Sequence, residues 1–210
     1  MSMKSLQAKL LLIFLPFFII AFGILAGISY YFSNQALTQS VDETAMSIGQ
    51  DYGNRIQANM RELQIQLADL ASIQRVRTGA DKPQIIEAMA EAQKRIGQLD
   101  VINFIYPDGS TIRSTGETAQ LGDREYFKKV MQTQKAYVSD PLVVRSTGKI
   151  SINIAVPVLF NGQLTGVLTG TYSLEKMSAL VKEVRFKSTG YGFIADDTGM
   201  LLAHGKGFVI

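Results

Sequence analysis

A stretch of 23 residues without a charged side chain, Leu10 to Phe32, constrains this chain more than any other feature. As a helix it would extend about 34 Å at roughly 1.5 Å per residue, which matches a bilayer hydrocarbon core about 30 Å thick. Pro16, Gly23 and Gly27 are compatible with this, because membrane helices tolerate both residue types better than soluble helices do. The stretch predicts a membrane-spanning helix that anchors the rest of the chain.

The alternative reading is a cleaved signal peptide with Lys4 and Lys9 as its positive region. The apolar core of a signal peptide has about 7–15 residues, and this run is longer, so we favour the anchor. Both lysines precede the span, whereas Asp42 and Glu43 follow it. The positive-inside rule then predicts a single-pass topology with a cytoplasmic N-terminus and with residues 33–210 outside the cell or in the periplasm.

The rest of the composition argues against nucleic-acid binding and against most enzymes. Two of the 21 basic residues precede the span, so nineteen remain against 18 acidic residues, too even a balance for a basic nucleic-acid-binding stripe. The chain has no Cys, and His204 is its one histidine, so thiolate, Ser-His and two-histidine zinc chemistry have almost no basis. Ser146 and Lys149 fit a penicillin-recognising S-x-x-K motif, but they fall in a polar turn rather than at a helix start. We therefore predict that the chain is not an enzyme and that it binds neither a metal ion nor a cofactor.

A long amphipathic helix is expected after the span. Apolar residues from Val41 to Val76 recur at a mean spacing of 3.5, which describes one stripe along a helix. From Leu63 onward the stripe is expected to pack on the following domain. Between Val41 and Tyr52, pairing with a second copy in a parallel homodimer is about equally favoured.

The following segment has the mixed pattern of an α+β domain with a mainly antiparallel sheet. A second helix opened by Pro83 is expected to run to about Gln98, and a third, capped by Asp123, from Arg124 to about Gln132. Hairpin turns are predicted at Pro107-Asp108-Gly109 and Asn161-Gly162. The strands are expected at 101–106, 111–114, 136–144, 149–160 and 163–173.

A second module of the same type is expected to begin near Ser188. The pair Phe193-Ile194 follows Phe104-Ile105 by 89 residues, and each pair precedes an Asp/Gly turn. Only the first hairpin of that module is expected before Ile210. The predicted organisation is a cytoplasmic N-terminus (1–9), a transmembrane helix (10–32), a long extracytoplasmic helix (33–80), a membrane-distal module (81–173), a connector helix (174–187) and an incomplete membrane-proximal module (188–210).

Candidate ligand-binding residues gather around the third helix and the strand after it. Arg124, with the helix N-terminus, can hold a carboxylate or phosphate, while Tyr126 and Phe127 enclose an apolar part. Tyr137 and Asp140 lie on the next predicted strand, where Asp140 could accept from an ammonium group. The alternative is that Arg124 and Asp140 pair with each other or with solvent and that the rings belong to the core.

The chain resembles the double Cache sensor domains of bacterial transmembrane receptors, whose modules are PAS-like. The motifs that carry the resemblance are Asp123 to Lys128, Ala136 to Pro141, Thr147 to Lys149, Ile154 to Pro157 and Gly166 to Leu168. The first 60 residues look most like methyl-accepting chemotaxis proteins. The resemblance implies a small ligand bound in the membrane-distal module and a signal that travels along the long helix into the membrane.

The same resemblance assigns roles to individual residues. Arg124 would hold an acidic group, Tyr126 and Phe127 would line the pocket, and Tyr137 and Asp140 would face it. Amino-acid receptors of this family carry a Trp-Tyr pair where this chain has Tyr126-Phe127, a tyrosine near Ala119 and an aspartate at the place of Thr171. Because the usual partner of the ammonium group is missing, a carboxylate or a neutral metabolite is as plausible a ligand as an amino acid.

The expected function is therefore extracytoplasmic sensing of a small molecule by a chemotaxis receptor, as a membrane-bound homodimer without nucleic-acid partners. Two alternatives keep the same binding module. In one it controls a histidine kinase or a diguanylate cyclase, and in the other it is an anchored binding protein that does not signal.

Overall fold

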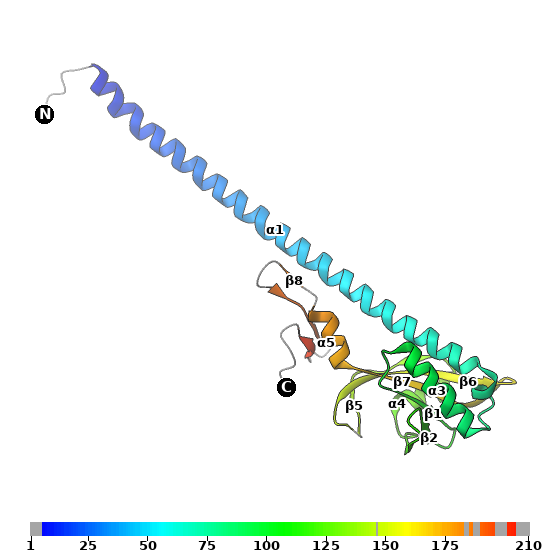
Figure 1. Cartoon of the computed structure of the whole chain (residues 1–210). Coiled ribbons are helices and arrows are strands. Elements are labelled where there is room, and N and C mark those ends of the chain that lie inside the picture. Colours follow the sequence, from blue (N-terminus) through cyan, green and yellow to red (C-terminus); the bar gives the residue numbers. More distant parts are fainter. Residues whose placement is uncertain (1–5, 146, 183–184, 187–189, 196–200, 205–210) are drawn as a thin grey trace. The chain divides into compact units, whose positions relative to one another are not determined.

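The computed structural model describes residues 6–145, 147–182, 185–186, 190–195 and 201–204 (Figure 1). The chain forms two compact units, residues 1–50 and 51–210. The chain begins with α1 (Leu6–Ser72), which runs through the first unit and contributes its last turns to the second.

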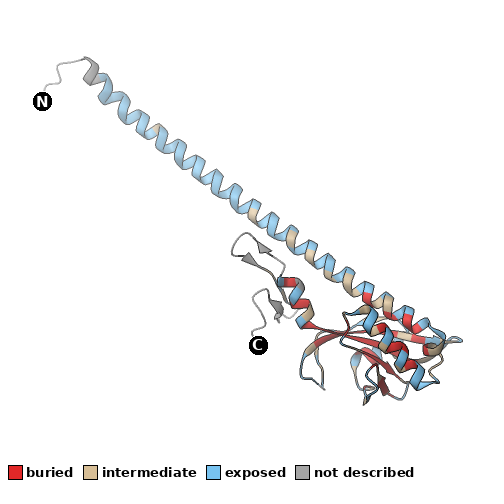
Figure 2. Cartoon of the chain, in the orientation of Figure 1, coloured by how far each residue is buried: buried red, intermediate tan, exposed pale blue. Residues whose placement is uncertain are grey.

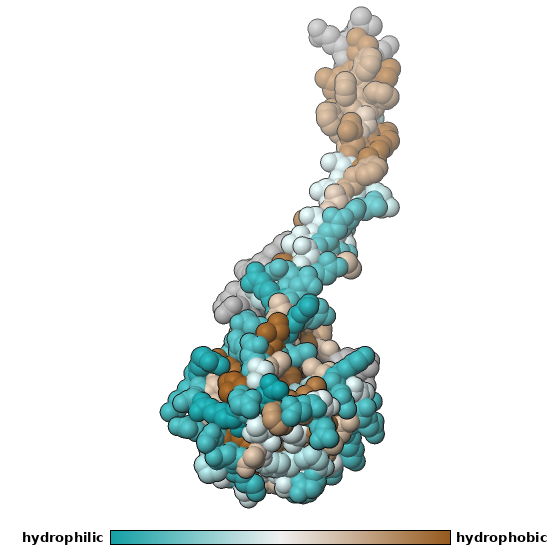
Figure 3. All heavy atoms as spheres, turned by 90° about the vertical axis from the view of Figure 1, so that its right-hand side faces the viewer, coloured by the Kyte–Doolittle hydropathy of each residue, from teal (hydrophilic) through white to brown (hydrophobic). Residues whose placement is uncertain are grey.

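The part of α1 that lies in the first unit exposes its apolar side chains. Its most apolar window has a mean hydropathy of 2.8 with no residue buried, and Phe22 is 68% exposed. Figure 2 shows this part of the helix almost entirely as exposed, and Figure 3 shows its apolar surface in brown. Water is an unfavourable environment for such a surface, at about 25 cal/mol per Å². Among the described residues, α1 is the one helix long and apolar enough to cross a bilayer.

Shorter helices follow α1 in the second unit. The long helix expected to reach residue 80 ends at Ser72, because Ile73 has an extended backbone (φ −64°, ψ 132°). The Asp81 carboxylate caps α3 by accepting a 3.2 Å hydrogen bond from the Gln84 amide, and Gly97 ends that helix in the left-handed conformation. The bounds are α2 (Gln74–Arg77), α3 (Lys82–Ile96), α4 (Glu125–Thr133) and α5 (Leu174–Lys182).

An antiparallel sheet of seven strands forms the centre of this unit. Its order is β3-β2-β1-β7-β6-β4, and β5 also pairs with β6, at residues 150–151, whereas β4 pairs at residues 154–155. The two longest strands, β6 and β7, are joined by the expected turn, with φ angles of 51° at Asn161 and 78° at Gly162. The bounds are β1 (Val101–Ile105), β2 (Ser110–Arg113), β3 (Thr118–Gln120), β4 (Tyr137–Val138), β5 (Leu142–Val143), β6 (Ile150–Phe160) and β7 (Gln163–Ser173).

The two faces of the sheet are covered by different helices. On one face, the end of α1 together with α2 and α3 builds the larger core, in which Leu67, Met89 and Phe104 have almost no exposed surface. On the other face, α4 covers a smaller core with Phe127 and Val130 (Figure 1). The α+β class and the antiparallel sheet are confirmed, as is the packing of the apolar stripe from Leu63 onward.

Three further expectations about local structure were wrong. The strand predicted over 136–144 is split into β4 and β5, and β3 was not expected. Asp123 does not cap α4: the cap position is Arg124, which makes no side-chain cap bond, and the Asp123 carboxylate pairs with Arg145 instead. The ion pair with Arg145, from a neighbouring loop, replaces the helix-capping hydrogen bond that was expected of Asp123.

After α5 the described residues form two short antiparallel pairs. Strand β8 (Arg185–Phe186) pairs with β9 (Gly190–Tyr191), and β10 (Phe193–Ala195) pairs with β11 (Leu201–His204). The second pair is the hairpin expected from the repeat. The turn expected at 196–199 lies outside the described residues, as does Ser146 of the dismissed S-x-x-K motif.

Candidate ligand-binding site

The sheet face that carries α4 changes from apolar to polar along its strands. Beneath α4 the central strands present Ile105 and Val167. Further along, Val101 on β1 is paired with Thr171 on β7, which is in turn paired with Asn153 on β6. Antiparallel register therefore brings three residues from distant parts of the sequence into one row.

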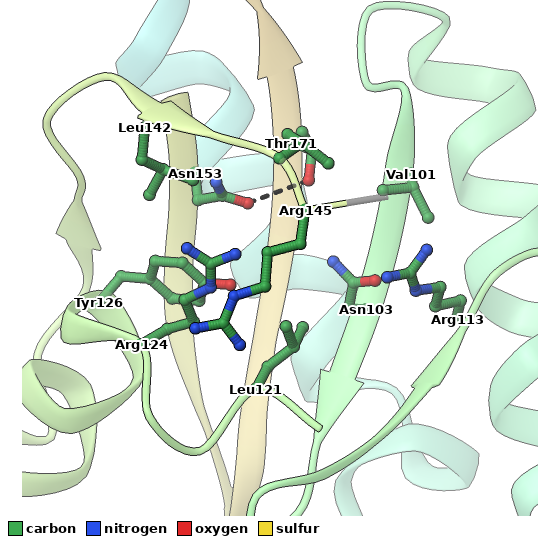
Figure 4. Close-up of a pocket in the computed structure, with 11 residues that line it drawn as sticks. Val101, Asn103, Arg113, Leu121, Arg124, Tyr126, Leu142, Arg145, Asn153 and Thr171 are labelled. Atoms are coloured by element: carbon green, nitrogen blue, oxygen red, sulfur yellow. Dashed lines mark hydrogen bonds between the residues drawn. The ribbon is translucent and has the colours of Figure 1, made fainter. Parts of the chain in front are cut away.

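A small cavity of about 50 Å³ lies over this polar part of the sheet (Figure 4). Its floor comes from β1, β6 and β7, and its sides come from β2, from the segment that leads into α4 and from the segment around β5. The lining residues are Val101, Asn103, Arg113, Leu121, Arg124, Tyr126, Leu142, Val144, Arg145, Asn153 and Thr171.

Hydrogen bonds hold the polar floor in place. The Asn103 amide nitrogen donates to the Thr169 hydroxyl at 3.1 Å, and the Thr171 hydroxyl donates to Oδ1 of Asn153 at 2.9 Å. Asn103 is only 4% exposed, yet its Oδ1 has no partner among the described residues. Because buried polar groups are rarely left unpaired, this oxygen is available to a ligand or to water in the cavity.

Three arginines give the small cavity a positive character, and no Asp or Glu lies among its lining residues in the described part of the chain. Arg145 is paired with Asp123, and Arg113 lies 3.4 Å from the Glu117 carboxylate. The Nε atoms of Arg113 and Arg124 are buried without a partner among the described residues. Such groups favour an anion, above all a planar carboxylate that accepts two parallel N–H bonds.

Two titratable groups at the small cavity show the effect of their surroundings. Burial raises the pKa of Tyr126, an effect that the positive charge of Arg124 partly offsets. The hydrogen bond from Arg145 lowers the pKa of Asp123 below its ordinary value. At neutral pH the tyrosine therefore stays a neutral hydroxyl, and the Asp123–Arg145 pair stays charged.

A larger cavity of about 350 Å³ adjoins the small one, because the two share Val101, Arg113, Val144 and Thr171. The residues that line the larger cavity alone are Asp100, Thr115, Thr147, Lys149, Ser151, Ser173, Glu175 and Lys176. Two ion pairs cross its border, Lys149 with Glu175 at 2.9 Å and Lys176 with Asp100 at 2.7 Å. Through Glu175 and Lys176, the first turn of α5 forms part of the wall.

The structure brings three of the six predicted site residues together. Arg124, Tyr126 and Thr171 line the small cavity. Phe127 is buried in the core under α4, and Tyr137 packs against that core without lining either cavity.

The sixth predicted residue, Asp140, is exposed and lines neither cavity. Its backbone carbonyl accepts a 2.8 Å hydrogen bond from the Ser139 hydroxyl. Asp140 is not paired with Arg124 by any hydrogen bond or ion pair between described residues.

Four polar residues of the small cavity were missed from the sequence: Asn103, Arg113, Arg145 and Asn153. A signal existed for the two asparagines, since a polar residue inside an otherwise apolar strand is unusual in a buried sheet. Arg113 carried the weaker signal of being the cross-strand partner of Asn103 in the predicted hairpin. Nothing local distinguishes Arg145, which reaches the cavity from a loop.

The arrangement suits the binding of a small anion. Guanidinium groups, amides and hydroxyls surround the cavity, and the described residues contain no cluster of His, Asp or Glu that could hold a metal ion. An apolar helical segment, a sheet covered on both faces and a polar cavity on one of them define a small-molecule-binding sensor domain.

The dCache_1 family model, described as a Cache domain, matches residues 33–208, and the chain belongs to this family. The resemblance seen in the sequence is thereby confirmed. Among curated proteins, the methyl-accepting chemotaxis protein PscA of Pseudomonas syringae pv. tomato is 27% identical over 96% of this chain. The chain spans 33% of the length of that relative.

Solved chemoreceptor domains share the fold. The ligand-binding domain of Pseudomonas fluorescens CtaA in complex with L-serine superposes with a TM-score of 0.68 at 17% identity, covering 79% of this chain and 73% of that one. The ligand-binding domain of Pseudomonas aeruginosa PctC in complex with GABA gives 0.62 at 23% identity, with 75% and 72% covered.

Proposed function

We propose that this chain is the sensor part of a chemotaxis receptor and that it binds a small carboxylate in the small cavity. The observation that carries the proposal is the group of arginines over a buried polar floor, with Arg113 Nε, Arg124 Nε and Asn103 Oδ1 unpaired among the described residues. The similarity to a chemotaxis protein and to chemoreceptor domains that hold L-serine and GABA supports the same conclusion.

In the proposed complex, Arg124 and Arg113 donate to the carboxylate from two sides of the small cavity. Asn153 already accepts from Thr171 through Oδ1, which leaves its amide nitrogen as a further donor. Asn103 Oδ1 accepts a hydrogen bond from an amino or hydroxyl group of the ligand. Charge-assisted bonds of this kind contribute about 1.5–3 kcal/mol each.

Signalling requires that the ligand bind two arrangements of the domain unequally. The cavities offer a direct route, because Thr171 lines both of them near the end of β7, and α5 begins at Leu174. A ligand that contacts the cavity floor at Thr171 would therefore act on the strand that leads into α5. We propose that the signal passes through β7 and α5. We also propose that the chain catalyses no reaction of its own.

The proposed receptor is anchored in the cell membrane by the helix over residues 10–32, with residues 33–210 on the extracytoplasmic side. It acts as a homodimer through α1. The exposed apolar side chains of the span and its mean hydropathy of 2.8 support the anchor, and the similarity to a chemotaxis protein supports the topology.

Thermal unfolding of the full chain in detergent, followed by tyrosine fluorescence, tests the binding proposal. The probes are acetate, succinate, L-serine and γ-aminobutyrate. At least one is expected to raise the unfolding temperature in proportion to the logarithm of its concentration, as a ligand that binds only the folded state does. Arg124→Ala and Arg113→Ala are each expected to weaken that probe by about tenfold or more.

Arg61→Ala is the matched control, because Arg61 is exposed on α1 and lines neither cavity. It removes the same charge and should leave the shift unchanged. If Arg124→Ala and Arg61→Ala respond alike to a probe that stabilises the wild type, the ligand lies elsewhere and the proposal fails.

Topology is tested by labelling with a membrane-impermeant maleimide. Because the chain has no Cys, each introduced thiol is the one reactive site. Gln39→Cys should react in intact spheroplasts, and Ser5→Cys should react only after lysis. The opposite pattern would reverse the orientation.

A further inference from the structure

Residues with polar or charged side chains supply most of the lining of the larger cavity. Ten of its twelve lining residues carry a polar or charged side chain, the exceptions being Val101 and Val144. Five of the ten are hydroxyl residues: Thr115, Thr147, Ser151, Thr171 and Ser173. A ligand held by its carboxylate in the small cavity would extend its remaining atoms into these surroundings, because the two cavities adjoin.

Ser151 shows most clearly that this wall is built for a hydrogen-bonding group. It is 1% exposed, and its Oγ has no partner among the described residues. Its cross-strand partner on β7 is Ser173, so two hydroxyl groups stand side by side on the floor. A hydroxyl can donate and accept, so the pair suits a ligand hydroxyl or amide.

The charged residues of the wall are largely paired with each other already. Lys149 binds Glu175, and Lys176 binds both Asp100 and the carbonyl of Gln98. They therefore form a neutral polar border rather than a second anion site. An apolar tail placed between them would displace water from these groups without replacing its hydrogen bonds, which is unfavourable.

We propose that the larger cavity selects the tail of the ligand, so that the receptor prefers carboxylates with a hydroxyl- or amide-bearing tail over carboxylates of equal size with an apolar tail. This inference rests on the proposed function, because it takes the carboxylate to be held by the arginines of the small cavity. Ser151 is the residue proposed to form a hydrogen bond with the polar group of the tail.

The test uses the full chain in detergent and two pairs of size-matched probes. L-Asparagine is compared with L-leucine, which replaces an amide by an isosteric branched alkyl group, and D-gluconate is compared with hexanoate. The polar member of at least one pair is expected to stabilise the chain at a concentration about tenfold or more below that of its apolar counterpart.

Ser151→Ala should narrow that difference, and the unfolding temperature without probe should not fall, because the removed hydroxyl has no partner to lose. Ser178→Ala is the matched control: Ser178 is also buried, at 4% exposed, with an unpaired Oγ, but it lies on α5 and lines neither cavity. Its difference between the paired probes should equal that of the wild type.

Equal or stronger stabilisation by the apolar member of both pairs overturns the inference, and so does an unchanged difference in Ser151→Ala. If the responses to these probes still vanish in Arg124→Ala, the carboxylate site stands while its selectivity for tails falls. If none of the four probes stabilises the chain, the proposed selectivity for tails is overturned. The carboxylate site is tested separately, with acetate, succinate, L-serine and γ-aminobutyrate.

Discussion

Thr171 on β7 donates a 2.9 Å hydrogen bond to Oδ1 of Asn153 on β6, and both side chains form the floor of the small cavity. They face each other because β6 and β7 pair in a register that sets Asn153 opposite Thr171. Thr171 is 6% exposed and Asn153 is 3% exposed, so the bond is sheltered from water. This bond fixes the orientation of the Asn153 amide, whose nitrogen is the proposed donor to the ligand.

Thr171→Val tests the energetic value of that bond. The substitution keeps the shape of the side chain but leaves Oδ1 of Asn153 buried and unpaired, so the free energy of unfolding should fall by about 1–3 kcal/mol. Urea unfolding of the full chain, followed by tyrosine fluorescence, measures the change. Thr118→Val, at an exposed site on β3, should stay within about 0.5 kcal/mol of the wild type. Equal effects in the two variants would refute the proposed role of the bond.

Gly166→Ala should be strongly destabilising, because a Cβ at Gly166 would lie 2.6 Å from ring carbons of Phe104 and 2.8 Å from the carbonyl oxygen of Ile105. Neither a buried ring nor a strand backbone can move away easily, so we expect a loss of about 2 kcal/mol or more.

Gly53→Ala is the control for that substitution, since Gly53 lies within α1 and a Cβ there meets nothing within 4 Å. Alanine favours the helix by roughly 1 kcal/mol over glycine, so this variant should be neutral or more stable. A tolerated Gly166→Ala would show that Phe104 is not packed against β7 as described.

Leu67→Ala and Ile65→Ala compare two faces of α1. Leu67 has no exposed surface and contributes to the core, whereas Ile65 is 54% exposed. Removing the Leu67 side chain should lower the free energy of unfolding by about 2–5 kcal/mol. Ile65→Ala should change it much less in the monomer. Similar losses in the two variants, measured by urea unfolding at low protein concentration, would contradict the packing of α1 on the sheet.

The helices and long strands could be predicted because their signals are local. Asp81 and Gly97 bound α3 through a capping carboxylate and a left-handed end, and Asn161-Gly162 fixed the turn between β6 and β7. The apolar helix that carries the proposed membrane span followed from its length and lack of charge alone.

The cavity could be predicted only in part, because pairing across strands brings its residues together. Asn153 and Thr171 are 18 residues apart, and Asn103 is 66 residues from Thr169. Register, which no single strand encodes, decides whether such residues share a face. The capping prediction for Asp123 also failed because of a distant partner, since Asp123 binds Arg145, which is 22 residues away in the sequence.

Acidification should break the Asp123–Arg145 pair within a defined pH range. The pKa of Asp123 in the folded chain lies below its ordinary value of 3.8, chiefly because Arg145 donates a hydrogen bond to the carboxylate. The contribution of the pair to stability is therefore fully present above pH 3.8 and is lost as the pH falls through the folded pKa. Because both side chains are largely exposed, that contribution is small.

The pKa itself is the sharper readout of this pair. In Arg145→Gln the pKa of Asp123 should rise toward its ordinary value, as followed by the carboxyl carbon resonance in an NMR titration. Asp108 is the internal control, since its pKa is lowered mainly by hydrogen bonds from Ser110 and should not respond. If Asp123 titrates at the same pH with and without the Arg145 guanidinium, the ion pair between them does not form in solution.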